Sequence, residues 1–131
     1  MHVSLVDPND TPPAACQGAL AITTRTNDSA TRNKLAGFED ATARIEIEAE
    51  RAFLTALDGS CRTPIAALAR IEGATLRFIG EALTPDGSAR WRRIESVPLG
   101  ANRQETAQKL GAKLGGEIRE EAGDAIVMDK A

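Results

Sequence analysis

Aromatic rings and histidine are scarce in this chain of 131 residues. Phe, Trp and Tyr together make up 3% of the residues, tyrosine is absent, and His2 is the single histidine. With so few rings, the chain is poorly suited to stacking on the bases of single-stranded nucleic acid. One histidine and two distant cysteines, Cys16 and Cys61, do not give the spacing of a Cys/His zinc site. We therefore expect a core of Leu, Ile, Val and Ala, and no metal site is predicted.

Long apolar runs and a strong excess of one charge are also missing. No stretch approaches the roughly 18–20 apolar residues that a membrane span needs, and the N-terminus has no basic region followed by an apolar run that would indicate a signal peptide. Lys and Arg number 16 against 19 Asp and Glu, a net charge of −3, which does not favour nucleic-acid binding through bulk charge. The expectation is a cytoplasmic protein with free thiols and with neither a membrane nor a nucleic-acid partner.

The first part of the chain has an irregular pattern. Proline and turn-forming residues between positions 7 and 13 predict a linker. Residues 19–26 alternate weakly and end in β-branched residues, which predicts a short strand with no obvious partner nearby. The run Asn27-Asp28-Ser29 offers an N-cap for a short helix over residues 29–36, which Gly37 breaks.

The remaining chain predicts one packed unit. Hydrophobic residues make up 42% of the sequence, and in two segments they recur at the spacing of an amphipathic helix. Between these segments lie three short strands joined by tight turns, which favours an antiparallel meander. We predict an α+β fold, a three-stranded antiparallel sheet covered on one face by helices (an open-faced sandwich). The expected elements are helices over residues 39–57 and 102–122, strands over 65–71, 75–84 and 91–98, and an extended piece at 126–128.

Cys61 is the candidate for chemistry. It lies among small residues just after the predicted helix over 39–57, where a thiol would be reachable. Arg62 and Arg51 would lower the thiol pKa and raise the fraction of nucleophilic thiolate, whereas the negative end of the helix dipole would oppose them. A small buried cysteine is the structural alternative, and a redox-sensing thiol is another. No histidine is near in sequence, so a cysteine protease is not favoured.

Four other groups of residues have simple structural interpretations. Alternate residues of a helix point apart, so three glutamates are interpreted as a solvated face. Arginines around Trp91 could form an anion site, but charges on an edge strand also discourage aggregation. Glycines in the last helix follow no strand, so close packing on the sheet explains them better than a dinucleotide loop. A tight turn is expected before residue 19. The residues concerned are Glu46, Glu48 and Glu50; Arg90, Arg92 and Arg93; Gly111, Gly115 and Gly116; and Cys16, Gln17 and Gly18.

One run of the sequence resembles a family signature. Residues 50–65, ERAFLTALDGSCRTPI, resemble the cofactor-attachment motif of porphobilinogen deaminase, also called hydroxymethylbilane synthase. Residues 13–22, PAACQGALAI, are similar to the family's Pro-Ala-x-Gly-Gln-Gly segment, and residues 85–88, PDGS, to its common hairpin turn. Three positions depart from the family pattern: Cys16 stands where glycine is usual, Thr23 where an acidic residue is usual, and Arg62 where glutamine is commoner.

The resemblance implies that the chain matches only the C-terminal part of a three-domain protein. Residues 1–37 would be a remnant of the preceding domains, and residues 38–131 would be the C-terminal cofactor-attachment domain. In this family that third domain is a three-stranded antiparallel sheet with helices on one face, which agrees with the fold predicted above. Apolar surface in residues 1–37 that is meant for absent domains would favour self-association of the separate chain, whereas the full-length enzyme is expected to be a monomer.

The resemblance also implies a chemistry. In the family, the cysteine at the position of Cys61 forms a thioether to a dipyrromethane cofactor, on which porphobilinogen units condense with loss of ammonia. The product, hydroxymethylbilane, is released by hydrolysis and serves tetrapyrrole (heme) biosynthesis, so the whole enzyme is a transferase. Arginines that hold the pyrrole carboxylates belong to the first two domains, so the fragment alone is predicted to be inactive, and no catalytic residue is assigned to it. The alternative is a non-catalytic interaction or regulatory domain that shares this fold.

Overall fold

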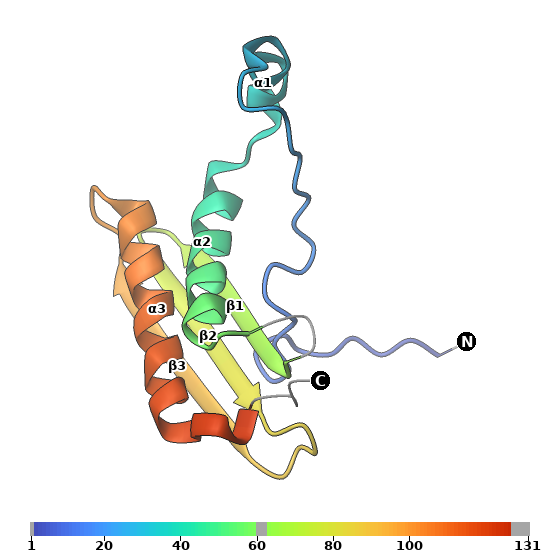
Figure 1. The fold of residues 1–131 in the computed structure, drawn as a ribbon, viewed down its shortest axis with the longest axis vertical. Coiled ribbons are helices and arrows are strands. Elements are labelled where there is room, and N and C mark those ends of the chain that lie inside the picture. The colour runs from blue at the N-terminus through green and yellow to red at the C-terminus, as the bar shows by residue number, and fades with distance from the viewer. Residues whose placement is uncertain (1, 60–62, 127–131) are drawn as a thin grey trace.

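The computed structural model describes residues 2–59 and 63–126. Three antiparallel strands form one sheet in the order β1-β2-β3. Helices α2 and α3 lie side by side on one face of this sheet, as Figure 1 shows. The predicted open-faced α+β sandwich is therefore confirmed. In chain order the elements are α1 (Ser29–Leu35), the 3₁₀ helix η1 (Ala36–Phe38), α2 (Ala41–Ala56), β1 (Ile65–Glu72), β2 (Thr75–Leu83), β3 (Arg90–Pro98), α3 (Arg103–Ala122) and the 3₁₀ helix η2 (Gly123–Ile126).

Side-chain caps fix where the first two α-helices begin. At α1, the sequence predicts a cap within residues 27–29, and the structure gives it to Asp28, whose carboxylate accepts a hydrogen bond from the Thr31 N–H at 3.0 Å. At α2, Asp40 Oδ1 accepts from the N–H groups of Thr42 and Ala43 at 2.9 and 3.0 Å. These bonds satisfy donors that have no partner inside the helix, so each helix starts directly after its aspartate.

The core lies between the sheet and the two covering helices. Phe53 of α2 and Phe78 of β2 are fully buried, and their rings meet at a centroid distance of 5.3 Å. Phe53 also covers Gly80, where an added Cβ would lie 2.5 Å from the ring. Aliphatic side chains complete the layer, as the scarcity of rings predicts. Among the buried aliphatic residues are Leu57, Ile65, Ala67, Leu76, Leu110, Leu114 and Ile118.

Two glycines of α3 allow the helices to approach closely. An added Cβ at Gly111 would lie 2.0 Å from the Ala49 carbonyl oxygen, and one at Gly115 would lie 2.7 Å from the Phe53 carbonyl oxygen. The sequence predicts that these glycines pack closely on the sheet. That prediction is wrong about the packing partner, because both glycines pack on α2. At Gly116 an added Cβ would meet no atom within 4 Å, so this glycine is not required for packing.

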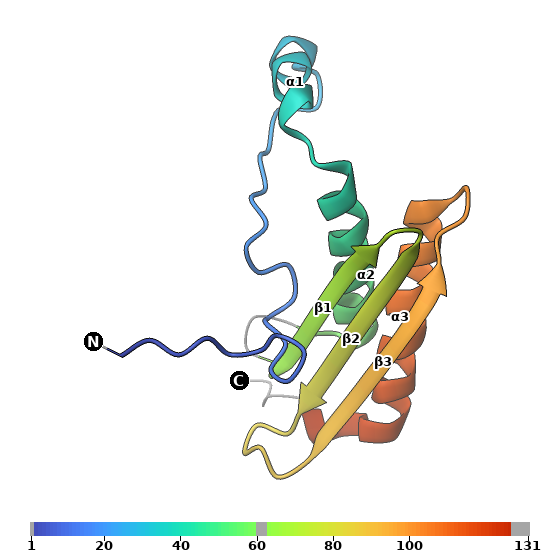
Figure 2. The same cartoon turned by 180° about the vertical axis from the view of Figure 1, so that it is seen from behind.

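The N-terminal segment covers part of the other face of the sheet, near the start of β1 (Figure 2). Arg77 donates a hydrogen bond to Asn9 Oδ1 at 2.8 Å, and Arg92 donates to the carbonyl oxygens of Asn9 and Asp10. Ile79 points to this face and is fully buried although no helix covers it. The proline-rich linker is therefore a cover for the sheet, which the sequence does not indicate.

Two predicted extended segments are not formed as expected. Residues 19–25 carry no strand, because in the described chain no neighbouring strand lies beside them to complete a ladder. Ile126 ends η2 and is buried in the core at 2% exposure, since the chain turns back at Gly123 instead of extending. The rest of the expected piece over 126–128 lies outside the described residues.

The short helix α1 stands away from the packed unit (Figure 1). None of its residues is buried, whereas the packed unit starts with α2. This contrast fits a division near residue 38, and the assignment of residues 1–37 to preceding domains stays a prediction.

Candidate functional site

Cys61 lies outside the described residues, so the site is built from its two flanks. On the helical side, Leu57 caps α2 and is buried, and its carbonyl oxygen accepts a hydrogen bond from Arg119 of α3 at 3.0 Å. Asp58 then adopts a left-handed backbone with φ of +53°, a conformation that aspartate tolerates better than most residues. The end of α2 is thus fastened to α3 four residues before position 61.

Gly59 is held by close packing. Its N–H donates to the Leu54 carbonyl oxygen at 2.9 Å. An added Cβ would lie 2.6 Å from both Leu54 Cδ1 and Ile65 Cδ1. The sequence predicts a glycine C-cap here; the structure gives the left-handed position to Asp58, and Gly59 leaves room for the side chains of Leu54 and Ile65, which meet there.

The strand side of the junction is fixed as well. The Pro64 carbonyl oxygen accepts a hydrogen bond from the Leu83 N–H at 3.0 Å, and Ile65 is buried. Positions 60–62 therefore connect two points that belong to the packed unit.

The outer edge of β1 is capped by other parts of the chain. Three successive outward N–H groups find acceptors: Ala67 donates to the Pro13 carbonyl oxygen at 3.0 Å, Ala69 to Glu50 Oε1 at 2.8 Å, and Ile71 to Glu46 Oε1 at 2.9 Å. This edge consequently offers no free donor at these positions to an added strand. The interpretation of the glutamates of α2 as a solvated face is wrong for Glu46 and Glu50, because their carboxylates turn to the strand that passes beside them.

Glu50 joins three parts of the fold. It is 6% exposed, and its second oxygen accepts from the Cys16 N–H at 2.6 Å. Burial raises the pKa of this carboxyl above its usual range, and the hydrogen bonds from Ala69 and Cys16 oppose that rise in part. We define the carboxylate clamp as Glu50 with its two donors, the N–H groups of Cys16 and Ala69. The clamp ties the N-terminal segment to α2 and β1.

Cys16 is a poor nucleophile. Its thiol is half-buried, and burial followed by the Glu50 charge raises its pKa, against a smaller opposing effect of Arg51. A raised pKa lowers the thiolate fraction at neutral pH. A structural role in the turn before residue 19 therefore fits Cys16 better than chemistry does.

Replacement of Cys16 by glycine is expected to stabilise the protein. Cys16 has a φ of +63°, which glycine adopts without strain, and its N–H bond to Glu50 does not involve the side chain. The gain from relieved strain is partly offset by the greater freedom of glycine in the unfolded chain, so we expect a rise of up to about 1 kcal/mol in the free energy of unfolding. Urea denaturation followed by circular dichroism measures it, and a loss of more than about 0.5 kcal/mol would contradict this explanation.

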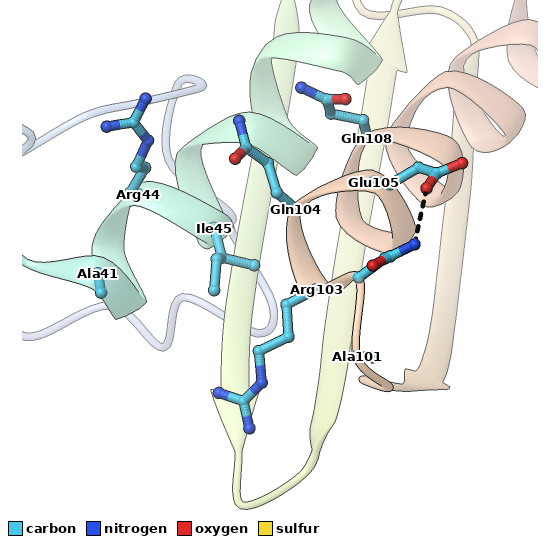
Figure 3. Close-up of a pocket in the computed structure, with 9 residues that line it drawn as sticks. Ala41, Arg44, Ile45, Ala101, Arg103, Gln104, Glu105 and Gln108 are labelled. Atoms are coloured by element: carbon cyan, nitrogen blue, oxygen red, sulfur yellow. Dashed lines mark hydrogen bonds between the residues drawn. The ribbon is translucent and has the colours of Figure 1, made fainter.

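The arginines around Trp91 are paired within the chain. Arg90 and Arg92 bind Glu81, which is buried, and Arg93 reaches across to two glutamates of α3. Figure 3 shows a hollow between the first turns of α2 and α3, at the end of α2 opposite the junction, in which Arg44 and Arg103 extend in different directions. Neither the arginines around Trp91 nor the hollow therefore forms a cluster of unpaired cationic side chains that could bind an anion.

The described residues form neither a metal-binding cluster nor a membrane-spanning helix. No three His, Cys, Asp or Glu side chains among them come together to hold a metal ion. None of their helices is both long and apolar enough to cross a membrane.

Comparison with known proteins assigns the packed unit to a protein family. The family model described as porphobilinogen deaminase, C-terminal domain, matches residues 44–120. The chain belongs to the porphobilinogen deaminase family. The match includes most of α2, the junction with position 61, the whole sheet and most of α3, and it confirms the resemblance found in the sequence.

Relatives show how much of the family's length the chain represents. The chain is 46% identical over 130 residues to porphobilinogen deaminase of Phenylobacterium zucineum, and 45% identical over 126 residues to that of Caulobacter vibrioides; each match covers 95% of this chain and 39% of the relative. The chloroplastic porphobilinogen deaminase of Pisum sativum is 40% identical over 116 residues, 88% of this chain and 31% of that protein. The chain thus spans about two fifths of the length of the curated relatives it matches.

Proposed function

We propose that this chain is the cofactor-anchoring C-terminal domain of a porphobilinogen deaminase, with Cys61 as the attachment residue for dipyrromethane. The observation that supports this most directly is the family match over residues 44–120, which includes position 61 and both of its flanks. The run over 50–65 adds the motif in which the family carries its attachment cysteine. On this proposal, the chain takes part in a transferase reaction of heme biosynthesis.

The residues of the junction suit an anchor. A thiol is a soft nucleophile that forms a stable bond to carbon, so Cys61 Sγ would give up its proton and bond to the methylene carbon of an aminomethyl pyrrole, whose carbon–nitrogen bond breaks and releases ammonia. The bound group supplies the pyrrole to which porphobilinogen units are added. Leu57 and Ile65 are buried in the packed unit, so the segment that bears Cys61 starts and ends at fixed points of the domain, to which the growing chain would be tethered.

The carboxylates of the cofactor require cationic partners, and the packed unit offers few. A pyrrole chain bears acetate and propionate groups, for which arginine is the suitable partner. Most arginines of the packed unit are already engaged by acceptors of this chain. The pairs are Arg44 with Glu39, Arg70 with Glu46, Arg90 and Arg92 with Glu81, Arg93 with Glu117 and Glu121, and Arg119 with the Leu57 carbonyl oxygen.

The purified 131-residue chain is therefore expected not to convert porphobilinogen. The cations that would orient the substrate carboxylates come, on this proposal, from the part of the enzyme that precedes the match. Incubation with porphobilinogen and detection of the linear tetrapyrrole after acid oxidation measures the activity. Turnover by the separate chain above that of a heat-denatured sample would show that these residues suffice and would contradict the expectation.

Attachment at Cys61 is tested in a joined protein. Here this chain replaces the matching stretch of the Phenylobacterium zucineum relative, so that the preceding part is present on the same polypeptide. We expect the intact mass to exceed that of the polypeptide by two linked pyrroles, and Cys61→Ser to abolish the increment. Cys16→Ser is the matched control and keeps it, because its raised thiol pKa and its place in a turn exclude it as the anchor.

Two outcomes would contradict the proposal. The first is a folded joined protein whose Cys61 is unmodified and whose activity survives Cys61→Ser, as expected of an interaction domain that shares the fold. The second is an increment that Cys61→Ser leaves in place.

A further inference from the structure

The C-terminal end of α2 comes shortly before position 61, and α2 itself provides no cation there. The last carbonyl groups of a helix carry partial negative charge, which disfavours a thiolate nearby. Lysine or arginine in the last turn usually offsets this charge. The last turn of α2 contains no basic residue. The segment that bears position 61 therefore follows a helix end that does not neutralise its own dipole.

Arg119 of α3 supplies the missing cation. Its Nη1 donates a hydrogen bond of 3.0 Å to the Leu57 carbonyl oxygen, in a partly buried contact. The carbonyl groups of residues 53–55 accept from backbone N–H groups of the helix end, whereas the Leu57 carbonyl takes its donor from the other helix. The guanidinium thus satisfies the last carbonyl of the helix end and places a positive charge at the negative end of the α2 dipole.

Close helix packing brings Arg119 to this place. Gly115 stands one turn earlier on α3, where an added Cβ would lie 2.7 Å from both the Phe53 carbonyl oxygen and the Ala56 Cβ. Residues four apart share a face of a helix, so the approach at Gly115 directs Arg119 to the end of α2. In the described part of the chain Arg119 forms no ion pair with a carboxylate, unlike the arginines of β3, so no direct partner cancels its charge there.

We propose that Arg119 is a positioning residue for cofactor attachment, which fixes the point where the chain leaves α2 and favours the thiolate of Cys61 by opposing the charge of the helix end. Arg119 acts through Leu57 and not by contact with the pyrroles. The consequence for the enzyme rests on the proposed function, whereas the electrostatic effect applies to a thiol at position 61 whatever its role. Four residues of chain reach at most about 14 Å, so a modest, salt-sensitive effect is expected.

Other charged side chains near this helix end enter the same balance. They are Arg51 and Asp58 on the α2 side and Glu120 next to Arg119 on α3, and all three are exposed. The first charged residue of β1, Arg70, pairs with Glu46. These groups are the same in every variant below, so a difference between the variants reports the charge that was changed.

The pH profile of alkylation tests the electrostatic effect on the separate 131-residue chain. Iodoacetamide is applied between pH 6 and pH 9, and modification of Cys61 is followed by the mass of the tryptic peptide over residues 52–62. Arg119→Met removes the charge, so the profile should move to higher pH and the rate at pH 7 should fall at least about 2-fold. Arg119→Lys keeps the charge and should stay within about 1.5-fold of the parent.

Arg103→Met is the matched control. It removes the same charge from the first turn of α3, at the end opposite the junction (Figure 3), and should leave the profile unchanged. A merely structural loosening would alter the rate reached at high pH, where the thiol is ionised, without moving the midpoint of the profile. Added salt should bring the rate of the parent at pH 7 toward that of Arg119→Met, because screening weakens the charge.

The consequence for attachment is measured in the joined protein, produced in cells that lack porphobilinogen and then mixed with porphobilinogen. Arg119→Met should gain the mass of two linked pyrroles at least about 2-fold more slowly than the parent at pH 7, and reach the same final mass. If the parent gains no such mass, the proposed function fails, while the alkylation profiles still decide the electrostatic role of Arg119.

Two results would overturn the proposal. One is the same midpoint and the same rate at pH 7 for the parent and for a folded Arg119→Met variant. The other is an equal shift in Arg103→Met, since the effect would then come from net charge and not from the end of α2. Circular dichroism reports whether each variant is folded, and Arg119→Gln replaces Arg119→Met in the comparison if the latter does not fold.

Discussion

Gly111→Ala is expected to destabilise the packed unit by at least about 3 kcal/mol, and in a domain of ordinary stability this can prevent folding. The added Cβ would lie 2.0 Å from the Ala49 carbonyl oxygen and 3.0 Å from the Phe53 backbone nitrogen. Both atoms belong to the backbone of α2, so no side-chain rotation relieves the contact. The helices would have to separate, and the core side chains between them would lose contacts with α3.

Gly116→Ala is the matched control for this prediction. It makes the same change in the same helix, where an added Cβ meets nothing within 4 Å. Alanine has the higher helix propensity, so this variant should be more stable than the parent by up to about 1 kcal/mol. Urea denaturation followed by circular dichroism measures both variants. Equal stabilities for the two would contradict close helix packing as the reason for Gly111.

Loss of the carboxylate clamp has the second large effect. Glu50→Ala leaves the N–H groups of Ala69 and Cys16 without their acceptors, one of them at a fully buried residue. Because each unsatisfied buried donor costs about 1–3 kcal/mol, we expect a loss of at least about 2 kcal/mol in the free energy of unfolding. Proteolysis should also become faster in the segment around Cys16, which the clamp holds.

Glu48→Gln is the control for the clamp. Glu48 lies on the same helix and accepts one exposed hydrogen bond, from Gln108 at 2.8 Å, so its replacement should change stability by no more than about 0.5 kcal/mol. If Glu50→Ala lowered the free energy of unfolding by no more than this control does, the hydrogen bonds from the Cys16 and Ala69 N–H groups to Glu50 would not stabilise the fold as argued.

The clamp also predicts a pH dependence. Burial raises the pKa of Glu50 in the folded state, so the folded protein holds this proton more tightly than the unfolded chain does. This tighter proton binding increases the free energy of unfolding. The increase is fully present below the ordinary glutamate pKa and is lost as pH rises through the raised pKa of Glu50. Glu50→Gln removes this titration, so its stability deficit relative to the parent should be larger at the acid end of that window than at neutral pH.

The helices and strands of the packed unit could be predicted because their local signals agree with the fold. Apolar periodicity, the caps at Asp28 and the turns around Gly73 and Gly87 place the boundaries within a few residues of those observed. The strand predicted over 19–26 failed because a strand needs a neighbour, and composition does not report whether one is present. The same limit hid the cover formed by residues 7–13, which depends on arginines far along the chain.

Sequence reasoning treated the residues around the candidate site unequally. Position 61 stands out first as a cysteine among small residues just after a predicted helix, and the motif over residues 50–65 then gives it a role. Glu50 was missed because it was grouped with Glu46 and Glu48 as solvated, and only the course of β1 beside α2 shows that it is buried. Glu50 stands near the charged residues Glu48 and Arg51, so its local sequence carries no signal that sets it apart.

The fold explains how one domain can carry an anchor and also depend on the rest of an enzyme. The junction before β1 is fastened by Arg119, Gly59 and Pro64 to the core of the packed unit. The arginines of that unit are mostly held by its own carboxylates, and its N-terminal segments leave apolar side chains exposed. On the proposed function, attachment of the cofactor is local to this unit, whereas binding of the substrate carboxylates falls to the preceding part of the enzyme.

The most direct test of the account is the mass of one peptide. Trypsin cleaves after Arg51 and Arg62, so Cys61 lies in the peptide over residues 52–62. From the joined protein, we expect this peptide to carry two linked pyrroles on its sulfur, while the peptide with Cys16 is unmodified. An unmodified peptide 52–62 from a joined protein that forms the linear tetrapyrrole would contradict the assignment of Cys61 as the anchor.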